Sequence, residues 1–337
     1  MSNDIHTPSR RSTTGSGHRQ HTDPLAAGRD QKRRTIHLGD LLFGGSARAS
    51  SLLIVATVLV LGVFLLGNAW QPLLDNTANF FATTTFNSSA RPPHFGVAAL
   101  LWTTVLSSLI ALLLAVPVAV GIALLLTQYV GGRVSRWIGF VVDLLAAVPS
   151  VIFGLWGIKV LGPALQPVAH WLQAHLGWFP LFSNTQVTSP GTVFTASVVL
   201  ALMVLPIITS VTRDVFAQTP REQIEAALAL GATRWEVIHM TVLPYGRSGA
   251  TAAAMLGLGR ALGETIAVML ILSASSFDVS IFSGGETFAS IIARNAAEFD
   301  TTYKAGIYIS AGLVLFVLTF AVNALARVVA ERGKAKS

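Results

Sequence analysis

Cysteine is absent from this chain of 337 residues, which excludes disulfide bonds and thiolate chemistry. Charged side chains are scarce, at 12% of residues against 52% apolar ones, whereas soluble domains carry roughly a quarter charged residues. No segment matches the loop GxxxxGK[ST] that cradles nucleotide phosphates. No cluster of His, Cys and carboxylates has metal-ligand spacing, and no nucleophile lies beside a base. We therefore expect no catalytic residue, no metal and no cofactor, and the composition predicts a membrane protein.

Long apolar runs indicate how the chain crosses the membrane. A helix needs about 20 apolar residues to cross the hydrocarbon core. We predict an all-α polytopic membrane protein with six transmembrane helices, at residues 51–70, 98–126, 138–161, 193–212, 250–273 and 306–328. Three of these runs contain a proline near the middle, Pro117, Pro149 and Pro206. We expect each proline to kink its helix where neighbouring helices satisfy the freed carbonyl group.

Lysine and arginine are distributed unevenly between the connections. The tail before residue 51 carries eight, the connections 127–137 and 213–249 carry two and four, and the tail from residue 327 carries four. The three intervening connections carry one, none and two. Cytoplasmic loops are enriched in these residues, so we expect both termini and the connection 213–249 in the cytoplasm. The formal charge of +7 is then a topology signal, and we do not expect nucleic-acid binding.

The chain divides into four regions by composition. Residues 1–49 are rich in Arg, Ser, Thr and Gly and predict a disordered basic cytoplasmic tail. Residues 50–97 predict a retained anchor helix and an outer segment, because no signal-peptide cleavage site accompanies the apolar run. Residues 98–330 are expected to form the helical core, with 213–249 as its cytoplasmic loop, and 331–337 a cytoplasmic tail.

A short polar helix is predicted in that cytoplasmic loop. Thr219 and Glu222 have the spacing of a capping box, and Pro220 would occupy the first helical position. The helix should begin at about Pro220. Gly231 is the expected stop, since glycine adopts the conformation that ends a helix.

A second short helix is predicted to follow. Thr233 and Glu236 repeat the capping-box spacing, and the helix should run toward Pro244. Its apolar residues fall on one face, Trp235, Ile238 and Val242. Such a face would suit docking into a groove on a soluble protein. The alternative is an amphipathic loop that rests on its own bundle.

The sequence of this cytoplasmic loop resembles that of a known family. The run EAALALGATRWEVIHMTVLP at 225–244 resembles the EAA loop of ABC-importer permeases, in which Glu-Ala-Ala is followed by a glycine and by Leu-Pro. The matching positions are Glu225, Ala226, Ala227, Gly231, Leu243 and Pro244. Thr241 departs from the isoleucine or valine that is usual there. The resemblance implies a coupling helix that inserts into a separate ATPase subunit.

Two opposite charges lie inside the fifth apolar run. The segment GLGRALGETIAV places Arg260 and Glu264 four residues apart, which predicts one helical face. At 1.5 Å per residue from Ala250, Arg260 would lie roughly 15 Å deep in the membrane. Intramembrane charges are costly and commonly mark a substrate pathway. An internal Arg260–Glu264 pair that locks the helix is the structural alternative.

The chemistry of this pair suits an oxyanion. The planar fork of Arg260 can donate two parallel, charge-assisted hydrogen bonds to a tetrahedral anion. Glu264 would offset that charge, so that the anion does not bind too tightly to leave. These properties do not distinguish phosphate from sulfate or molybdate.

A second resemblance narrows the substrate. The segments AVPSVIFGLWG (147–157) and GLGRALGETIAVMLI (257–271) resemble the PstC-type permeases of phosphate-specific ABC importers. The resemblance implies a type I ABC importer permease (MetI-like) fold with Arg260 and Glu264 in the substrate pathway. It implies inorganic phosphate as substrate, moved by alternating access, and ATP hydrolysis outside this chain. The implied partners are a second PstA-type permease, an ATPase dimer on the cytoplasmic side, an extracytoplasmic phosphate-binding protein and membrane lipid. The implied location is the inner (plasma) membrane of a bacterium.

Two other classes of function stay open: a phosphate-sensing scaffold subunit, and an ion channel that works without ATP. The remaining charges of the spans and outer segments predict no site. Asp143 and Lys159 are expected to be structural, and the outer cations are expected to be solvated, namely Arg91, Arg294 and Lys304.

Overall fold

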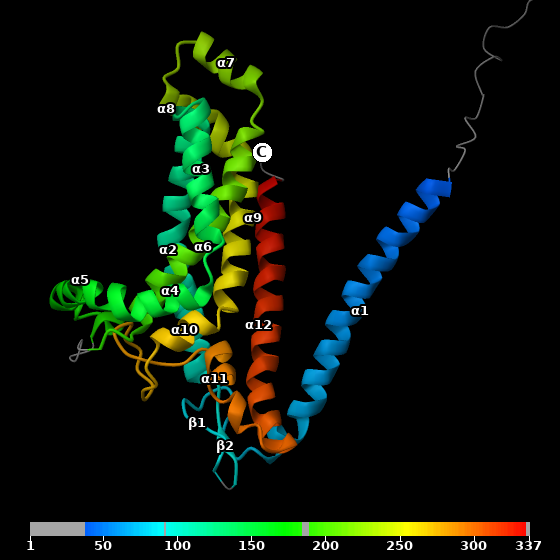
Figure 1. The fold of residues 1–337 in the computed structure, drawn as a ribbon, viewed down its shortest axis with the longest axis vertical. Helices are drawn as coiled ribbons and strands as arrows, with labels where there is room; N and C mark the ends of the chain where they lie inside the picture. Colours follow the sequence, from blue (N-terminus) through cyan, green and yellow to red (C-terminus); the bar gives the residue numbers. More distant parts are fainter. Residues whose placement is uncertain (1–37, 91, 184–188, 335–337) are drawn as a thin grey trace, which may run out of the picture. The chain divides into compact units, whose positions relative to one another are not determined.

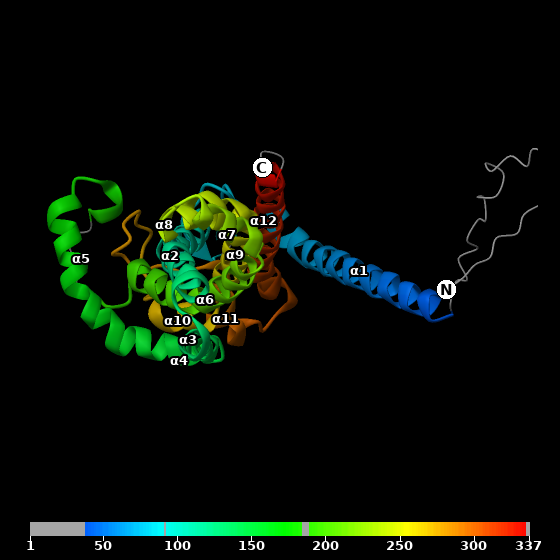
Figure 2. The same ribbon diagram turned by 90° about the horizontal axis from the view of Figure 1, so that it is seen from above.

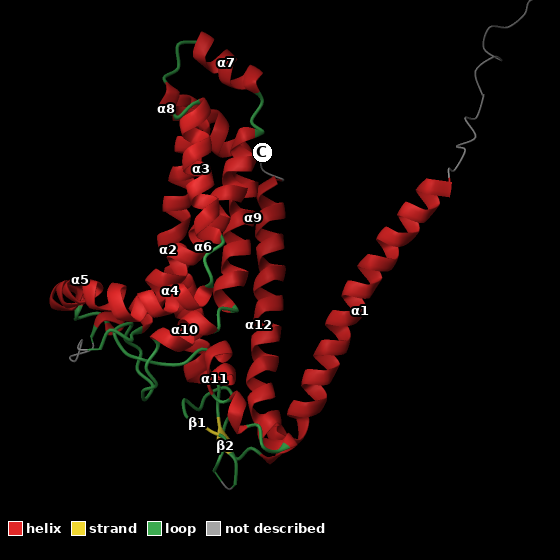
Figure 3. Cartoon of the chain, in the orientation of Figure 1, coloured by secondary structure: helices red, strands yellow, loops and turns green. Residues whose placement is uncertain are grey.

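The computed structural model describes residues 38–90, 92–183 and 189–334. The predicted tail segments 1–37 and 335–337 lie outside these residues. Helices form nearly all of the regular structure that is described (Figure 3). A small antiparallel sheet joins β1 (Phe86–Asn87) to β2 (His94–Phe95). The predicted all-α class is confirmed.

The chain divides into two units, Met1–Ala56 and Thr57–Ser337. The described part of the first unit is the start of α1 (Leu38–Asp75). Residues 38–49 are therefore helical, and the prediction of disorder is wrong for them. The segment LGDLLFGGSARAS contains no proline, so nothing stops the helix from extending ahead of the apolar run.

Four long helices make the centre of the second unit (Figure 1), α2 (Ala98–Leu124), α6 (Val193–Ala217), α9 (Leu243–Leu262) and α12 (Thr302–Lys334). The face of α2 toward α6 is a row of alanines at every fourth position, each at most 1% exposed: Ala111, Ala115, Ala119 and Ala123. This spacing places them on one side of the helix. Their small side chains let the two helices approach closely.

Five helices within the described ranges are long and apolar enough to cross a membrane: Gly45–Asp75, Ala98–Tyr129, Ser150–Leu176, Val193–Ala217 and Thr302–Leu325. Four of the six predicted spans, the first, second, fourth and sixth, coincide with four of these. Pro117 and Pro206 lie inside α2 and α6, as expected.

The third predicted span, 138–161, is divided between two helices. α3 (Gly132–Ala146) ends before Pro149, which has an extended ψ of 139° and precedes α4 (Ser150–Trp156). Proline disfavours helical geometry in the residue before it, so the chain breaks here instead of kinking. The apolar helix continues beyond α4 through a π-helical turn, η2 (Gly157–Leu161), into α5 (Gly162–Leu176).

The fifth predicted span, 250–273, is also divided. α9 ends at Leu262, Gly263 follows as its C-cap, and α10 (Ile266–Ile271) starts after a short break. α9 packs between α6 and α12, and its low apolar content keeps it out of the five candidates. The remaining short elements are η1 (Leu125–Tyr129), η3 (Pro180–Phe182), α11 (Phe288–Arg294) and η5 (Ala296–Glu298).

Candidate functional site

The two predicted spans that the structure divides, 138–161 and 250–273, contact each other. α4 packs against α10, and Gly154 lies so close that an added Cβ atom would be 2.9 Å from the Cα atom of Ala267 and 3.2 Å from its carbonyl oxygen. Three residues further, a Cβ atom on Gly157 would be 3.0 Å from a methyl carbon of Ile271. The segments 147–157 and 257–271 therefore form one contact in the bundle.

The tightness of this contact gives a prediction. Gly154→Ala should lower the Tm of the purified chain, because the obstructing atoms belong to backbone, and overpacking costs about 1–3 kcal/mol. Gly121→Ala on α2 is the matched control, since nothing lies within 4 Å of its Cβ position. Thermal unfolding of the two variants would be followed by size-exclusion chromatography. An equal Tm for both would contradict the close approach of α4 and α10.

The predicted relation between Arg260 and Glu264 is corrected by the break. Because α9 ends at Leu262, Glu264 is not one turn above Arg260 on a continuous helix. Among the described residues no ion pair joins the two side chains. Glu264 instead lies just before Thr265, the N-cap of α10, and its Oε1 accepts a hydrogen bond from the backbone N–H of Ala267 at 3.3 Å. The i,i+4 spacing alone favours one continuous helix, so the sequence interpretation missed the break.

Arg260 lies on the side of α9 that its own bundle leaves open. It is exposed, as are Leu256 and Ala252, which lie one and two turns before it, whereas Gly257 and Ala261 are buried. Glu264 is half-buried. The site therefore presents a guanidinium group outward, with a carboxylate held at the break just beyond it.

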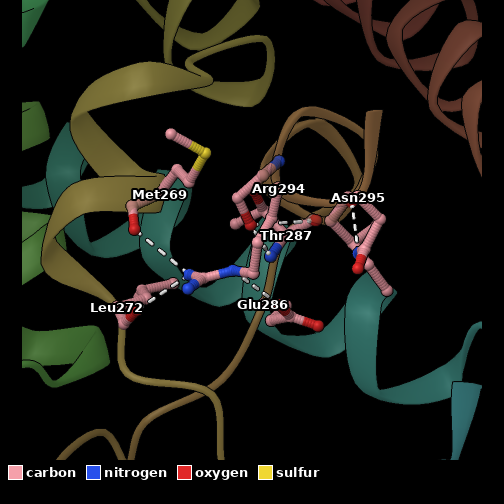
Figure 4. A network of polar contacts seen from close by, with 8 residues as sticks. Met269, Leu272, Glu286, Thr287, Arg294 and Asn295 are labelled. Atoms are coloured by element: carbon pink, nitrogen blue, oxygen red, sulfur yellow. Dashed lines mark hydrogen bonds and ion pairs between the residues drawn. The ribbon is translucent and has the colours of Figure 1, made fainter. Parts of the chain in front are cut away.

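Arg294 is a residue that the sequence interpretation missed. It was expected to be solvated, but its Nε lies 3.0 Å from Oε1 of Glu286. Its Nη2 donates hydrogen bonds to the carbonyl oxygens of Met269 (3.1 Å) and Leu272 (3.0 Å), at the end of α10 (Figure 4). The carbonyl partners are 25 and 22 residues away in the chain, so no local pattern could have revealed them.

The predicted pair of short helices is present at one end of the bundle, as α7 (Arg221–Ala229) and α8 (Arg234–Val237) (Figures 1 and 2). The second capping box is confirmed: the backbone N–H of Glu236 donates to Oγ1 of Thr233 at 3.3 Å, and that of Thr233 donates to Glu236 at 2.7 Å. Hydrogen bonds from the backbone and then the hydroxyl of Thr233 lower the pKa of Glu236.

The prediction of a capping box between Thr219 and Glu222 is wrong. Pro220 is the N-cap of α7, and no side chain caps the helix. The hydroxyl of Thr219 is buried and forms no hydrogen bond within the described part of the chain. Its backbone N–H bonds to the carbonyl of Phe216, so Thr219 belongs to the turn that follows α6. Gly231 is confirmed as the stop, with a φ of +87° and open space around its Cβ position.

The predicted apolar face of the second helix is mostly internal. Ile238 and Val242 are at most 1% exposed, and they belong to η4 (Ile238–Val242), a π-helical turn that leads directly into α9. Pro244 therefore lies in the first turn of α9 instead of ending the second helix. The expectation that this face is free for docking is wrong for these two residues, because they pack on the bundle.

A different set of side chains is free at this end. Four large apolar residues around the α7–α8 turn are between 45% and 91% exposed, Leu228, Leu230, Trp235 and Met240. Glu225 and Ala226 are exposed and Ala227 is half-buried. The turn therefore offers an apolar surface beyond the end of the bundle.

Of the secondary charges, Asp143 lies 4.0 Å from Arg213 and links α3 to α6, which agrees with a structural role. Lys159 is exposed. Within the described residues no group of three or more His, Cys, Asp or Glu side chains could hold a metal ion.

Comparison with known proteins identifies the family to which this chain belongs. Residues 115–334, from the middle of α2 to α12, match the family described as "Binding-protein-dependent transport system inner membrane component". The chain belongs to this family and is a multi-pass membrane protein. The phosphate transport system permease protein PstC 2 of Mycobacterium tuberculosis (strain ATCC 25618 / H37Rv) is 56% identical over 302 residues, which cover 88% of this chain and 93% of that protein. Within its class, the chain belongs to the PstC permeases.

Two solved structures support the fold. One is the MetNI methionine ABC transporter in an inward-facing conformation, with a TM-score of 0.52, 16% identity, and coverage of 70% of this chain and 96% of the other. The other is a bacterial ABC transporter involved in the import of the polysaccharide alginate, with a TM-score of 0.51, 16% identity, and coverage of 86% and 98%. The type I ABC importer permease (MetI-like) fold is thereby confirmed.

Proposed function

We propose that this chain is the permease subunit that moves inorganic phosphate into the cell as part of an ATP-driven importer. The observation that carries the proposal is the 56% identity, over 302 residues, to a phosphate transport permease. The arrangement around Arg260 supports it, because a guanidinium fork suits a tetrahedral oxyanion. Sulfate or molybdate is the alternative cargo, since the fork alone does not separate these anions.

A second, PstA-type permease is the partner that the open face of α9 would need. Ala252, Leu256 and Arg260 are exposed along that face. A charge left against lipid is costly, so intramembrane arginines face a protein interior or a water-filled path. We place the phosphate pathway between this face and the second permease, with Arg260 binding the anion and Glu264 weakening its hold.

ATP would act through the α7–α8 turn. The chain has no loop for nucleotide phosphates, so hydrolysis is assigned to a separate ATPase dimer on the cytoplasmic side. The exposed residues Leu230 and Trp235 would insert into its groove, in the manner of other apolar helix faces. Glu225, Ala226, Ala227 and Gly231 keep their proposed coupling role. Both termini are then cytoplasmic.

The extracytoplasmic phosphate-binding protein would dock at the other end. That end carries β1, β2 and α11 (Figure 1), and a cavity of about 440 Å³ opens there between Thr85, Thr103, Ser276 and Glu286. Docking at one end and ATP-driven closure at the other would switch the bundle between outward and inward access. Coupling of this kind needs the two states to differ in their contacts with each partner.

Uptake of labelled phosphate by phosphate-starved cells, with and without this chain, tests the proposal. We expect deletion to abolish high-affinity uptake, and excess sulfate or molybdate to leave uptake by intact cells unchanged. Competition by either anion would instead favour the other cargo. Unchanged uptake, with altered phosphate-responsive expression, would favour a sensory scaffold; a strain without other phosphate importers prevents masking.

A further inference from the structure

α10 has a charged side chain at each end. At its start, Oε1 of Glu264 accepts a hydrogen bond from the N–H of Ala267. At its end, Nη2 of Arg294 donates to the carbonyl oxygens of Met269 and Leu272. A carboxylate at the N-terminus and a guanidinium at the C-terminus both complement the helix dipole. They also satisfy backbone groups that have no partner inside the helix.

A helix of six residues is not stable by itself, so its surroundings decide where α10 lies. One face is buried, with Ala267, Val268 and Ile271 at most 1% exposed. Gly154 sets how closely that face approaches α4. Apolar packing is non-directional, whereas the hydrogen bonds at the two ends are directional. The end contacts therefore help to fix α10 along its own axis, together with the hydrogen bond that the backbone N–H of Ser273, just beyond its end, donates to the carbonyl oxygen of Gly191 at 3.2 Å.

α11 delivers the cationic end. Arg294 is its last residue, and Glu286 lies just before Thr287, the N-cap that starts it. The Thr287 hydroxyl accepts from the N–H of Ser290 at 3.1 Å, which defines the start of the helix. The ion pair thus joins the two ends of α11 and orients the guanidinium group toward α10 (Figure 4).

Glu286 is the half-buried counter-ion of Arg294, and its burial disfavours the charged carboxylate. Its side chain is 21% exposed. Burial raises the pKa of Glu286, and the charge of Arg294 and its hydrogen bond oppose that shift. The carboxylate and the guanidinium group therefore depend on one another, because a buried carboxylate is costly without a cation beside it.

We propose that Arg294 is a positioning residue for Glu264. By holding the last carbonyl groups of α10 it fixes that helix along its axis, and with it the carboxylate at the opposite end. The functional meaning rests on the proposed role of Glu264 in the phosphate pathway. The competing explanation is that the Arg294–Glu286 pair merely stabilises the outer loop, in which case the contacts with the carbonyl groups are incidental.

The absence of cysteine in the chain allows a direct test with a single cysteine as reporter. Ile266→Cys places a thiol on the first residue of α10, which is partly exposed. In the assembled importer in lipid nanodiscs, the rate of reaction with a small maleimide would be read on this chain by mass spectrometry. We expect Arg294→Gln to change that rate at least threefold. Arg294→Lys should stay near the parent rate, because the ammonium group can still donate to the carbonyl oxygens.

A charge swap separates the two explanations. Glu286→Arg combined with Arg294→Glu keeps an ion pair but places an acceptor beside the carbonyl groups, so the altered rate should persist. A return to the parent rate in the swap would overturn the proposal, as would an unchanged rate in Arg294→Gln. Trp178→Cys, at a residue that is 80% exposed and has no proposed role, is the reference, and an equal change there would indicate general destabilisation and also overturn it. The labelling rate is measured without phosphate, so this test can fail independently of the test of the transported anion.

Discussion

Arg260→Gln is expected to reduce phosphate uptake about 100-fold, while the protein still reaches the membrane. Glutamine keeps one hydrogen-bond donor group but loses the charge and the fork. Hydrogen bonds to charged groups contribute about 1.5–3 kcal/mol each, and a loss of about 2.7 kcal/mol corresponds to 100-fold in rate. Because Arg260 is exposed on α9 and no ion pair among the described residues involves it, its removal should not unfold the bundle.

Initial rates of labelled phosphate uptake, corrected for the amount of protein in the membrane, measure this effect. Arg260→Lys should give an intermediate rate, since an ammonium group keeps the charge without the planar fork. Arg136→Gln, an exposed arginine on α3, is the control for loss of one positive charge and should transport normally. Normal uptake by Arg260→Gln would remove Arg260 from the pathway.

The spans that hydropathy located correctly are those that are apolar along their whole length, such as α2 and α6. The other two were divided for reasons that hydropathy does not detect. Pro149 adopts an extended ψ between α3 and α4, and α9 ends with Gly263 as its C-cap, just before Glu264, whose carboxylate accepts a hydrogen bond from the first turn of α10. In both places an apolar run continues across a backbone break, so sequence alone predicted a single helix.

Two identical cap spacings had different outcomes, which shows what local patterns leave undetermined. Thr233 forms its capping box with Glu236 in an exposed turn. Thr219 has the same spacing to Glu222, but it is 5% exposed and its backbone N–H bonds to the carbonyl of Phe216 in the last turn of α6. Burial and the preceding helix decided the second case, and neither is written in the four residues of the motif.

The site was predictable in its residue types but less so in its geometry. Arg260 and Glu264 were found because charges are rare in an apolar run. Their separation by a helix break was not predicted, and Arg294 escaped notice because its partners are distant in the sequence. Charged side chains stand out in an apolar sequence, whereas tertiary contacts determine which of them act together.

Gly231→Val is expected to lower the amount of phosphate transported per ATP hydrolysed about tenfold. Gly231 has a φ of +87°, a conformation that a β-branched residue adopts at a cost of about 1–3 kcal/mol. No atom lies within 4 Å of its Cβ position, so the substitution acts through the backbone and not through a clash. The turn that presents Leu230 and Trp235 to the ATPase should then change shape, while the membrane bundle stays as it is.

The measurement is phosphate transport and ATP hydrolysis by the same reconstituted importer, expressed as their ratio. Gly231→Asn should keep the parent ratio, because asparagine tolerates the left-handed conformation better than other residues with a side chain. Gly131→Val tests for unspecific effects: Gly131 also has open space around it, but its φ is −93°, so valine fits there without strain. If Gly231→Val and Gly231→Asn lower the ratio of transport to hydrolysis equally, side-chain size and not backbone conformation controls coupling. If neither variant lowers the ratio, the α7–α8 turn does not need its present shape to transmit the state of the ATPase to the bundle.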